Sequence, residues 1–284
     1  MVIATAGTTI LGAFDPIKEI YKITSKKGIW LHVDASWGGS VIFSNSEKRK
    51  LLQGIEKADS IVWNMHQMLK VPLQSSIFLT PHGDLFKKVF SADNSSQNNQ
   101  SYPIEYDLGE QSFQSSRRID SLKLWLPWKV YGDLGYQKHI DRNLQNAQLF
   151  AKMVKEHPEF KLVTDPIYAN VCFWYLPQEN LTFGQLNELA PKIKGKLLLE
   201  GKIMLGYHSW GDHPNFFRMI FHDSRLTESD LKQILWILEE TGKKIYLDLY
   251  AKMVTPAPNH VLPPVKTESK GRFSKSLKFI RKKD

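Results

Sequence analysis

Short apolar runs alternate with amphipathic stretches over the first 130 residues. Four of these runs have the length and the Val, Ile and Trp content of strands: residues 2–4, 29–33, 60–63 and 76–79. Between the first two, Asp15-Pro16 predicts a helix start, with a capping carboxylate and a proline in the first turn, and Gly28 predicts its end. Strands that alternate with helices favour a parallel α/β sheet buried on both faces.

From about residue 140 the pattern changes. One face of a predicted helix carries Leu144, Ala147, Phe150 and Val154. Two apolar runs, residues 171–176 and 216–221, predict strands of a second sheet, and Thr227-x-x-Asp230 predicts a capped helix that ends at Gly242. We therefore expect a parallel α/β domain over residues 1–138, a small α+β domain over 139–250 and a flexible basic tail over 251–284.

The composition is that of a globular protein. Of the 284 residues 42% are hydrophobic and 24% charged, and no apolar run approaches the roughly 18 residues of a membrane-spanning helix. The only cysteine, Cys172, excludes a disulfide framework and a multi-cysteine zinc site. No metal site is expected. The N-terminal residues lack the charged and apolar regions of a signal peptide, which favours a cytoplasmic location.

The net charge of +9 is concentrated near the C-terminus. Residues 266–284 carry eight Lys or Arg residues against Glu268 and Asp284, so the remaining chain is close to neutral. This distribution argues against nucleic-acid binding by the whole chain. Phe273, Leu277 and Ile280 lie at helical spacing among the tail cations, which predicts at most weak contact with an anionic membrane; the alternative is a solvated terminus.

Several motifs in fixed order resemble one enzyme family. They are residues 4–9 (ATAGTT), 12–16 (GAFDP), 32–39 (HVDASWGG), 63–68 (WNMHQM), 170–175 (NVCFWY) and 215–219 (NFFRM). Together they resemble the group II pyridoxal-phosphate-dependent decarboxylases, and within that group the branch that acts on glutamate, aspartate and cysteine sulfinate. The resemblance covers about residues 1–245 and implies the aspartate-aminotransferase-like fold, called fold type I: the C-terminal half of its large domain plus its C-terminal domain.

The resemblance also implies roles for individual residues. Asp34 matches the carboxylate that keeps the pyridine nitrogen of the cofactor protonated, and the small Ala35 lets the ring lie flat. Thr5 and Thr8 match residues that line the ring, and His66 matches the histidine on the cofactor phosphate. These five residues form the implied contact set for pyridoxal 5'-phosphate.

A sixth residue, Arg218, matches the arginine that grips the substrate carboxylate of an acidic amino acid through a two-pronged hydrogen bond. The alternative for Arg218 is an ion pair at the surface. By the same resemblance we expect a homodimer, or a heterodimer with a decarboxylase paralogue.

Two positions depart from the family. The lysine that forms the Schiff base with the cofactor follows the histidine, and here that position is Gln67, whose amide nitrogen cannot form an imine. Lys70 lies about one helical turn away, roughly 5 Å, too far for a simple substitution. The family loop with a reprotonating tyrosine corresponds to residues 91–100, which contain no aromatic residue.

Length is a third departure, because the family has an N-terminal half that supplies dimer contacts and the phosphate loop. We therefore expect a truncated chain, a fragment or a degenerate gene product. The combined departures predict a catalytically impaired decarboxylase-like protein. Two alternatives stay open: an active decarboxylase that uses Lys70 or a partner subunit, and a non-catalytic scaffold that pairs with a paralogue and is localised by its tail.

Overall fold

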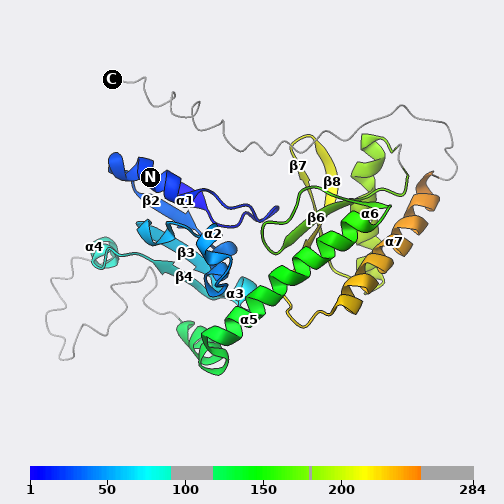
Figure 1. Ribbon diagram of the computed structural model, residues 1–284. Coiled ribbons are helices and arrows are strands. Elements are labelled where there is room, and N and C mark those ends of the chain that lie inside the picture. Colours follow the sequence, from blue (N-terminus) through cyan, green and yellow to red (C-terminus); the bar gives the residue numbers. More distant parts are fainter. Residues whose placement is uncertain (91–117, 179–180, 251–284) are drawn as a thin grey trace, which may run out of the picture. The chain divides into compact units, whose positions relative to one another are not determined.

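The first unit is built around a four-stranded sheet (Figure 1). The computed structural model describes residues 1–90, 118–178 and 181–250. Strands β1 (Val2–Thr5), β2 (Leu31–Asp34) and β3 (Ser60–Asn64) run parallel, and β4 (Ser76–Leu79) pairs antiparallel with β3. The four predicted strands are confirmed, but the expectation of an all-parallel, fully buried sheet is wrong at β4, an edge strand with mostly exposed side chains.

The reversal at β4 follows from the length of its connection. Only the one-turn helix α3 (Met65–Met68) and a short loop separate it from β3. A parallel return needs a crossover of about a dozen residues or more, so the chain turns back beside β3 instead. The first crossover is long enough, because α1 (Ile17–Lys26) joins β1 to β2 and buries Ile17 and Ile20.

The predicted ends of α1 are correct, but the predicted role of Asp15 is wrong. Pro16 occupies the N-cap position and no side chain caps the helix. The Asp15 carboxylate instead accepts a hydrogen bond from the backbone N–H of Thr5, with Oδ2 at 2.7 Å. The helix ends before Gly28, which has a left-handed φ of 59°.

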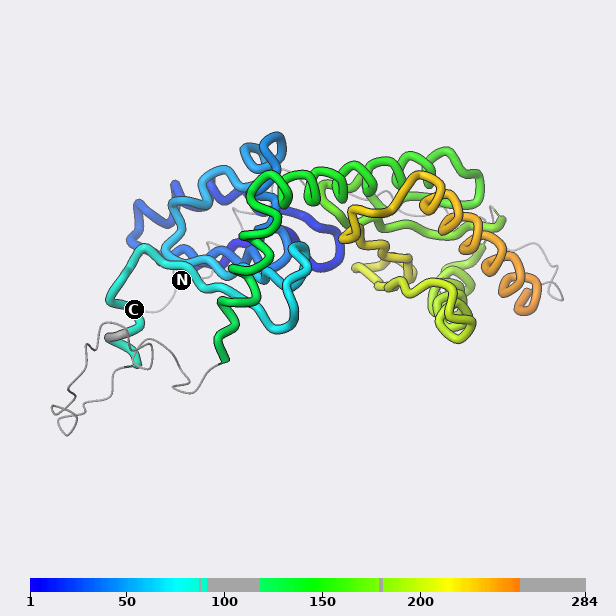
Figure 2. Tube along the Cα trace, turned by 90° about the horizontal axis from the view of Figure 1, so that it is seen from below, coloured from blue at the N-terminus to red at the C-terminus, as the bar shows by residue number. Residues whose placement is uncertain are grey.

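Shorter helices complete the sheet unit. They are η1 (Gly38–Phe43), α2 (Lys48–Leu51), η2 (Ile55–Lys57) and α4 (Leu85–Phe90). Helix α5 (Ser121–Glu156) is far longer than the sequence pattern indicated, and it bends at Gly132, where φ is 61° and ψ is −178°. The bend is visible in the green part of Figure 2.

The second unit holds a sheet in the order β5-β6-β8-β7, in which the β5–β6 and β7–β8 pairs are antiparallel. Its strands are β5 (Phe160–Leu162), β6 (Asn170–Tyr175), β7 (Gly206–Trp210) and β8 (His213–Ile220). All six side chains of β6 are buried, which makes it the centre of this core. Both predicted strands of this sheet are confirmed as β6 and β8.

Helices α6 (Phe183–Leu199) and α7 (Glu228–Tyr250) accompany this sheet. The predicted capping box is confirmed, since the Asp230 carboxylate accepts from the Thr227 N–H at 2.8 Å and the Thr227 hydroxyl accepts from the Asp230 N–H at 3.3 Å. The predicted end at Gly242 is wrong. A Cβ there would lie 2.4 Å from the Tyr175 ring, so this glycine admits an aromatic side chain within a continuous helix.

The chain divides into two compact units. Among the described residues, the first comprises those within 1–152, 166–171 and 219–231, and the second comprises those within 153–165, 172–218 and 232–250. The domain boundary after residue 138 stays a prediction, and the predicted tail lies outside the described residues. Within the part of the chain that the structure describes, no helix is long and apolar enough to cross a membrane.

Candidate active site

Most of the predicted site residues lie where the parallel strands of the first unit end. Thr5 and Asp34 are the last residues of β1 and β2 and are partners in the strand register. His66 and Gln67 lie in α3, directly after β3. In open α/β sheets the carboxyl edge of the parallel strands is where ligands bind, because loops and helix starts present their polar groups there. The first unit therefore brings Thr5, Asp34, Ala35, His66 and Gln67 to one edge.

Two glycines explain how the loops pack at this edge. Gly7 has a φ of 89°, and a Cβ on it would lie 2.8 Å from the backbone of Gly38. A Cβ on Gly38 would lie 2.4 Å from the carbonyl oxygen of Ala6. The ATAGTT and HVDASWGG segments thus pass within contact distance of each other, which only residues without side chains allow.

Asp34 is half-buried and partly engaged. Its Oδ1 accepts a hydrogen bond from the backbone N–H of Ser36 at 3.0 Å, while its Oδ2 has no partner among the described residues. Ala35 beside it is 1% exposed. One carboxylate oxygen therefore orders the turn after β2, and the other is available to a ligand.

Thr5 and Thr8 differ in the group that forms their hydrogen bond: the backbone N–H in Thr5 and the side-chain hydroxyl in Thr8. The Thr8 hydroxyl oxygen accepts from the backbone N–H of Ala13 at 3.0 Å and so closes the loop after β1. The backbone N–H of Thr5 is the group bound by Asp15. The hydroxyl proton of Thr8 remains free to donate, because only its oxygen is used.

His66 is anchored through one ring nitrogen. Nδ1 lies 2.9 Å from the carbonyl oxygen of Ser75 and 3.2 Å from its backbone nitrogen. Its Nε2 has no partner among the described residues. The anchoring fixes the ring and leaves Nε2 as the nitrogen available to an anion.

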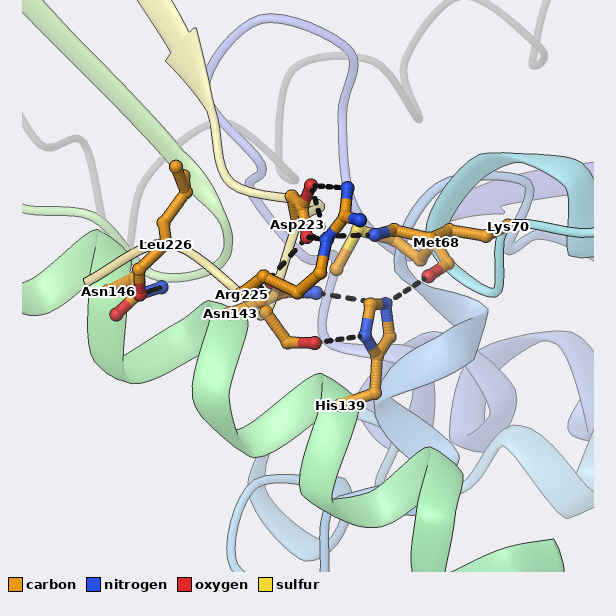
Figure 3. A network of polar contacts seen from close by, with 9 residues as sticks. Met68, Lys70, His139, Asn143, Asn146, Asp223, Arg225 and Leu226 are labelled. Atoms are coloured by element: carbon orange, nitrogen blue, oxygen red, sulfur yellow. Dashed lines mark hydrogen bonds and ion pairs between the residues drawn. The ribbon is translucent and has the colours of Figure 1, made fainter. Parts of the chain in front are cut away.

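Gln67 brings an amide to the position at which the family resemblance implies a lysine. Its Oε1 is buried and has no hydrogen-bond partner in the described part of the chain. A buried amide oxygen without a partner costs about 1–3 kcal/mol. The neighbouring lysine is not free to replace it, because Lys70 Nζ donates to Asp223 Oδ1 at 3.0 Å (Figure 3).

Arg218 lies on β8 in the second unit, so the structure describes it apart from the other site residues. It is paired in the sheet register with Gly206, whose missing side chain leaves room beside the guanidinium. Burial lowers the pKa of Arg218, and burial raises the pKa of the neighbouring Cys172 thiol to about 12. Arg218 is thus a half-buried cation beside a neutral thiol, and its orientation toward Asp34 and His66 stays a prediction.

The sequence motifs did not reveal the role of Asn170. This buried side chain accepts from Trp37 Nε1 at 2.7 Å and donates to the carbonyl oxygens of Thr9 and Ile10 at 3.0 and 2.9 Å. It ties together two loops of the carboxyl edge that are far apart in sequence. Its place in the NVCFWY motif was the only available signal.

Comparison with known proteins identifies the family. Residues 1–176 match the pyridoxal-dependent decarboxylase conserved domain. The acidic amino acid decarboxylase GADL1 of Bos taurus is 42% identical over 86% of this chain and 48% of its own length. Human cysteine sulfinic acid decarboxylase is 40% identical over 86% of this chain and 52% of its own length. The crystal structure of mouse CSAD superposes with a TM-score of 0.79 at 36% identity, covering 84% of this chain and 51% of that chain.

This chain belongs to the pyridoxal-dependent decarboxylase family, and the resemblance to its acidic amino acid branch is confirmed. The predicted fold type I is confirmed as well. The chain spans about half the length of the curated relatives it matches.

Proposed function

We propose that this chain has the fold of an acidic amino acid decarboxylase but does not decarboxylate with its own residues. The observation that carries the proposal is Gln67. Its amide nitrogen shares its electron pair with the carbonyl group and is not a usable nucleophile. The aromatic-free segment 91–100 lies outside the described residues, so its sequence alone supports the loss of the loop tyrosine.

The alternative of an active enzyme that uses Lys70 is weaker for a physical reason. An attacking amine must be unprotonated, whereas Lys70 pairs with a carboxylate that stays ionised. Hydrogen bonds from Arg225, together with Lys70, hold the pKa of Asp223 well below its usual range. The Lys70 amine is therefore engaged in an ion pair with Asp223.

The residues at the carboxyl edge fit pyridoxal phosphate in part. Asp34 offers one free carboxylate oxygen for the pyridine nitrogen, His66 offers Nε2 for the phosphate, and Thr8 offers a hydroxyl proton. Gln67 does not fit, since it supplies no covalent anchor. When bound, the cofactor supplies an electron sink. We propose that Thr5, Thr8, Asp34, Ala35 and His66 hold it without a covalent bond and weakly.

For the substrate and the assembly we propose what the family suggests. Arg218 would bind the carboxylate of an acidic amino acid. A second subunit, identical or paralogous, would complete the assembly. The exposed apolar side chains of α5 support a partner of this kind, since Trp125, Val130 and Leu134 are 55%, 78% and 72% exposed.

The test is direct. We expect the recombinant chain with added pyridoxal phosphate at pH 7 to lack the visible absorbance of a lysine-bound cofactor. Borohydride treatment followed by peptide mapping should yield no pyridoxyl-modified lysine in residues 60–80. An active cysteine sulfinic acid decarboxylase, treated in parallel, is the positive control. A modified Lys70 would contradict the proposal and favour the active alternative.

A further inference from the structure

A cavity of about 980 Å³ lies within the first unit, and its lining is rich in cations. Lys70, Lys138, Arg142 and Arg225 line it, and no acidic residue does so among the described residues. The apolar part of the lining includes Tyr131 and Tyr136. None of the residues proposed for the cofactor belongs to this lining. The cavity is thus a separate feature with its own chemistry.

Asp223 orients two of these cations from just outside the lining. Lys70 Nζ lies 3.0 Å from its Oδ1, and Arg225 Nη2 lies 2.7 Å from its Oδ2 (Figure 3). The single negative charge of Asp223 balances one of the four positive charges that line the cavity. The lining therefore keeps a net charge of three positive units. Charges of one sign collected in a cavity raise the local concentration of an oppositely charged ligand.

His139 on α5 contacts both segments that carry these charged residues, the one around Lys70 and the one around Asp223. The His139 ring lies 2.8 Å from the Ser224 hydroxyl and 2.9 Å from the carbonyl oxygen of Met68 (Figure 3). His139 Nε2 also lies 3.1 Å from the side-chain nitrogen of Asn143, so three partners fix the ring. Burial lowers the pKa of His139, which keeps the ring neutral at pH 7. His139 therefore positions both segments without adding charge.

Tyr136 supplies a second, independent observation. It is 3% exposed, and its hydroxyl is buried with no hydrogen-bond partner in the described part of the chain. A buried donor without a partner costs free energy unless a ligand uses it. Burial raises the pKa of this phenol, so it stays a neutral donor.

We propose that this cavity binds a small organic phosphate monoester. A dianion matches the three uncompensated charges better than a monocarboxylate does. Arginine side chains also bind phosphate oxygens through two parallel N–H donors. The volume is at the upper end of the range for ligand sites, about 300–1,000 Å³, and exceeds what a bare phosphate fills. The organic part of the ligand would contact Tyr131, and the Tyr136 hydroxyl would donate to an oxygen of the phosphate ester.

The experiment uses phenyl phosphate as the probe. It is titrated calorimetrically into the full 284-residue chain, with inorganic phosphate and phenol titrated separately. We expect one saturable site for phenyl phosphate, at least tenfold tighter than for either fragment. Phenol binding as tightly as the ester would overturn the charge argument, and inorganic phosphate binding as tightly would overturn the organic part.

Charge variants locate the site. Arg142→Ala and Lys138→Ala should each weaken phenyl phosphate binding about tenfold, equivalent to about 1.4 kcal/mol. The matched controls Arg49→Ala and Lys50→Ala, exposed cations on α2, should leave it unchanged. His66→Gln should also leave it unchanged, which separates this cavity from the proposed cofactor site. Equal losses in the controls, or a loss only in His66→Gln, would overturn the assignment.

Tyr136→Phe separates binding from folding. Without ligand this variant should unfold at the same or a higher temperature, because it removes a buried unpartnered hydroxyl and keeps the ring. Its affinity for phenyl phosphate should nevertheless fall severalfold. A purely structural hydroxyl would leave the affinity unchanged, and that result would exclude Tyr136 from the site.

Discussion

At the scale of single residues, Gln67 and Lys70 show how side-chain identity and backbone conformation limit chemistry. Gln67 carries a buried amide oxygen without a partner in the described residues, and Lys70 is the one described non-glycine residue with a positive φ, 56°. The left-handed region costs an ordinary residue roughly 1–2 kcal/mol. Lys70 therefore occupies a backbone position that favours glycine, and its amine is directed to Asp223.

Gln67→Lys tests whether one residue accounts for the proposed loss of activity. We expect no decarboxylation of glutamate, aspartate or cysteine sulfinate above a thousandth of a typical turnover number of about 10 per second. Residues that act as a unit are strongly non-additive, and the loop tyrosine is missing from the sequence too. The measurement is carbon dioxide release at saturating pyridoxal phosphate. Turnover within about tenfold of the typical value would make Gln67 the sole defect.

The backbone strain at Lys70 predicts that a glycine at this position is more stable than an alanine, the reverse of the usual order. Lys70→Gly and Lys70→Ala both lose the ion pair with Asp223, but only glycine adopts the left-handed conformation without cost. Lys70→Gly should therefore be the more stable of the two by about 1 kcal/mol, measured by urea unfolding. If alanine is equally stable, the backbone at this position is not strained.

At the scale of elements, two glycines that look alike in the sequence have opposite roles. Gly132 and Gly195 both lie within helices, and neither has an atom within 4 Å of an added Cβ. Gly132 has a backbone conformation that is essentially restricted to glycine, whereas Gly195 has an ordinary helical one. The bend of α5 thus depends on Gly132, and α6 gains nothing from Gly195.

Alanine substitutions should separate the two. Gly132→Ala should lower the free energy of unfolding by about 1–3 kcal/mol, because α5 must straighten or hold a strained residue. Gly195→Ala should raise it by about 0.5–1 kcal/mol, since alanine is the better helix former. Urea unfolding of both variants provides the measurement. A stabilising Gly132→Ala substitution would mean that the bend is not required.

At the scale of the whole molecule, the proposed partner should cover the first half of α5. The exposed apolar side chains there include Trp125, Leu126, Val130 and Leu134. Apolar surface gathered on one helix typically marks an interface in a soluble protein. We therefore expect the purified chain to form a dimer, as measured by light scattering after size-exclusion chromatography.

The double variant Val130→Glu, Leu134→Glu should be monomeric at the same concentration, because it buries two charges at the proposed interface. Ile167→Glu is the matched control. It places a charge on another half-exposed apolar side chain of the first unit and should stay dimeric. A dimer that survives the double substitution would place the interface elsewhere.

The sequence alone determined the local elements and the chemistry that depends on residue type. Alternating apolar runs gave the positions of β1 to β4, and Thr227 with Asp230 gave the start of α7, because periodicity and capping act over a few residues. The ordered motifs indicated the family, and Gln67 predicts the loss of the family's nucleophile, since an amide is unreactive wherever it lies. The roles of Thr5, Thr8, Asp34, Ala35, His66 and Arg218 stay predictions.

Tertiary structure decided what depends on contacts between distant segments. Three features depend on the folded structure: the antiparallel direction of β4, the continuation of α7 past Gly242 against Tyr175, and the bend at Gly132. Each follows from the space around a residue or from its backbone conformation, and residue type alone does not predict either. The pairing of Lys70 with Asp223 joins residues 153 positions apart. The cation-lined cavity likewise gathers its charges from three separate segments, because folding brings together side chains between which the sequence shows no periodic relation.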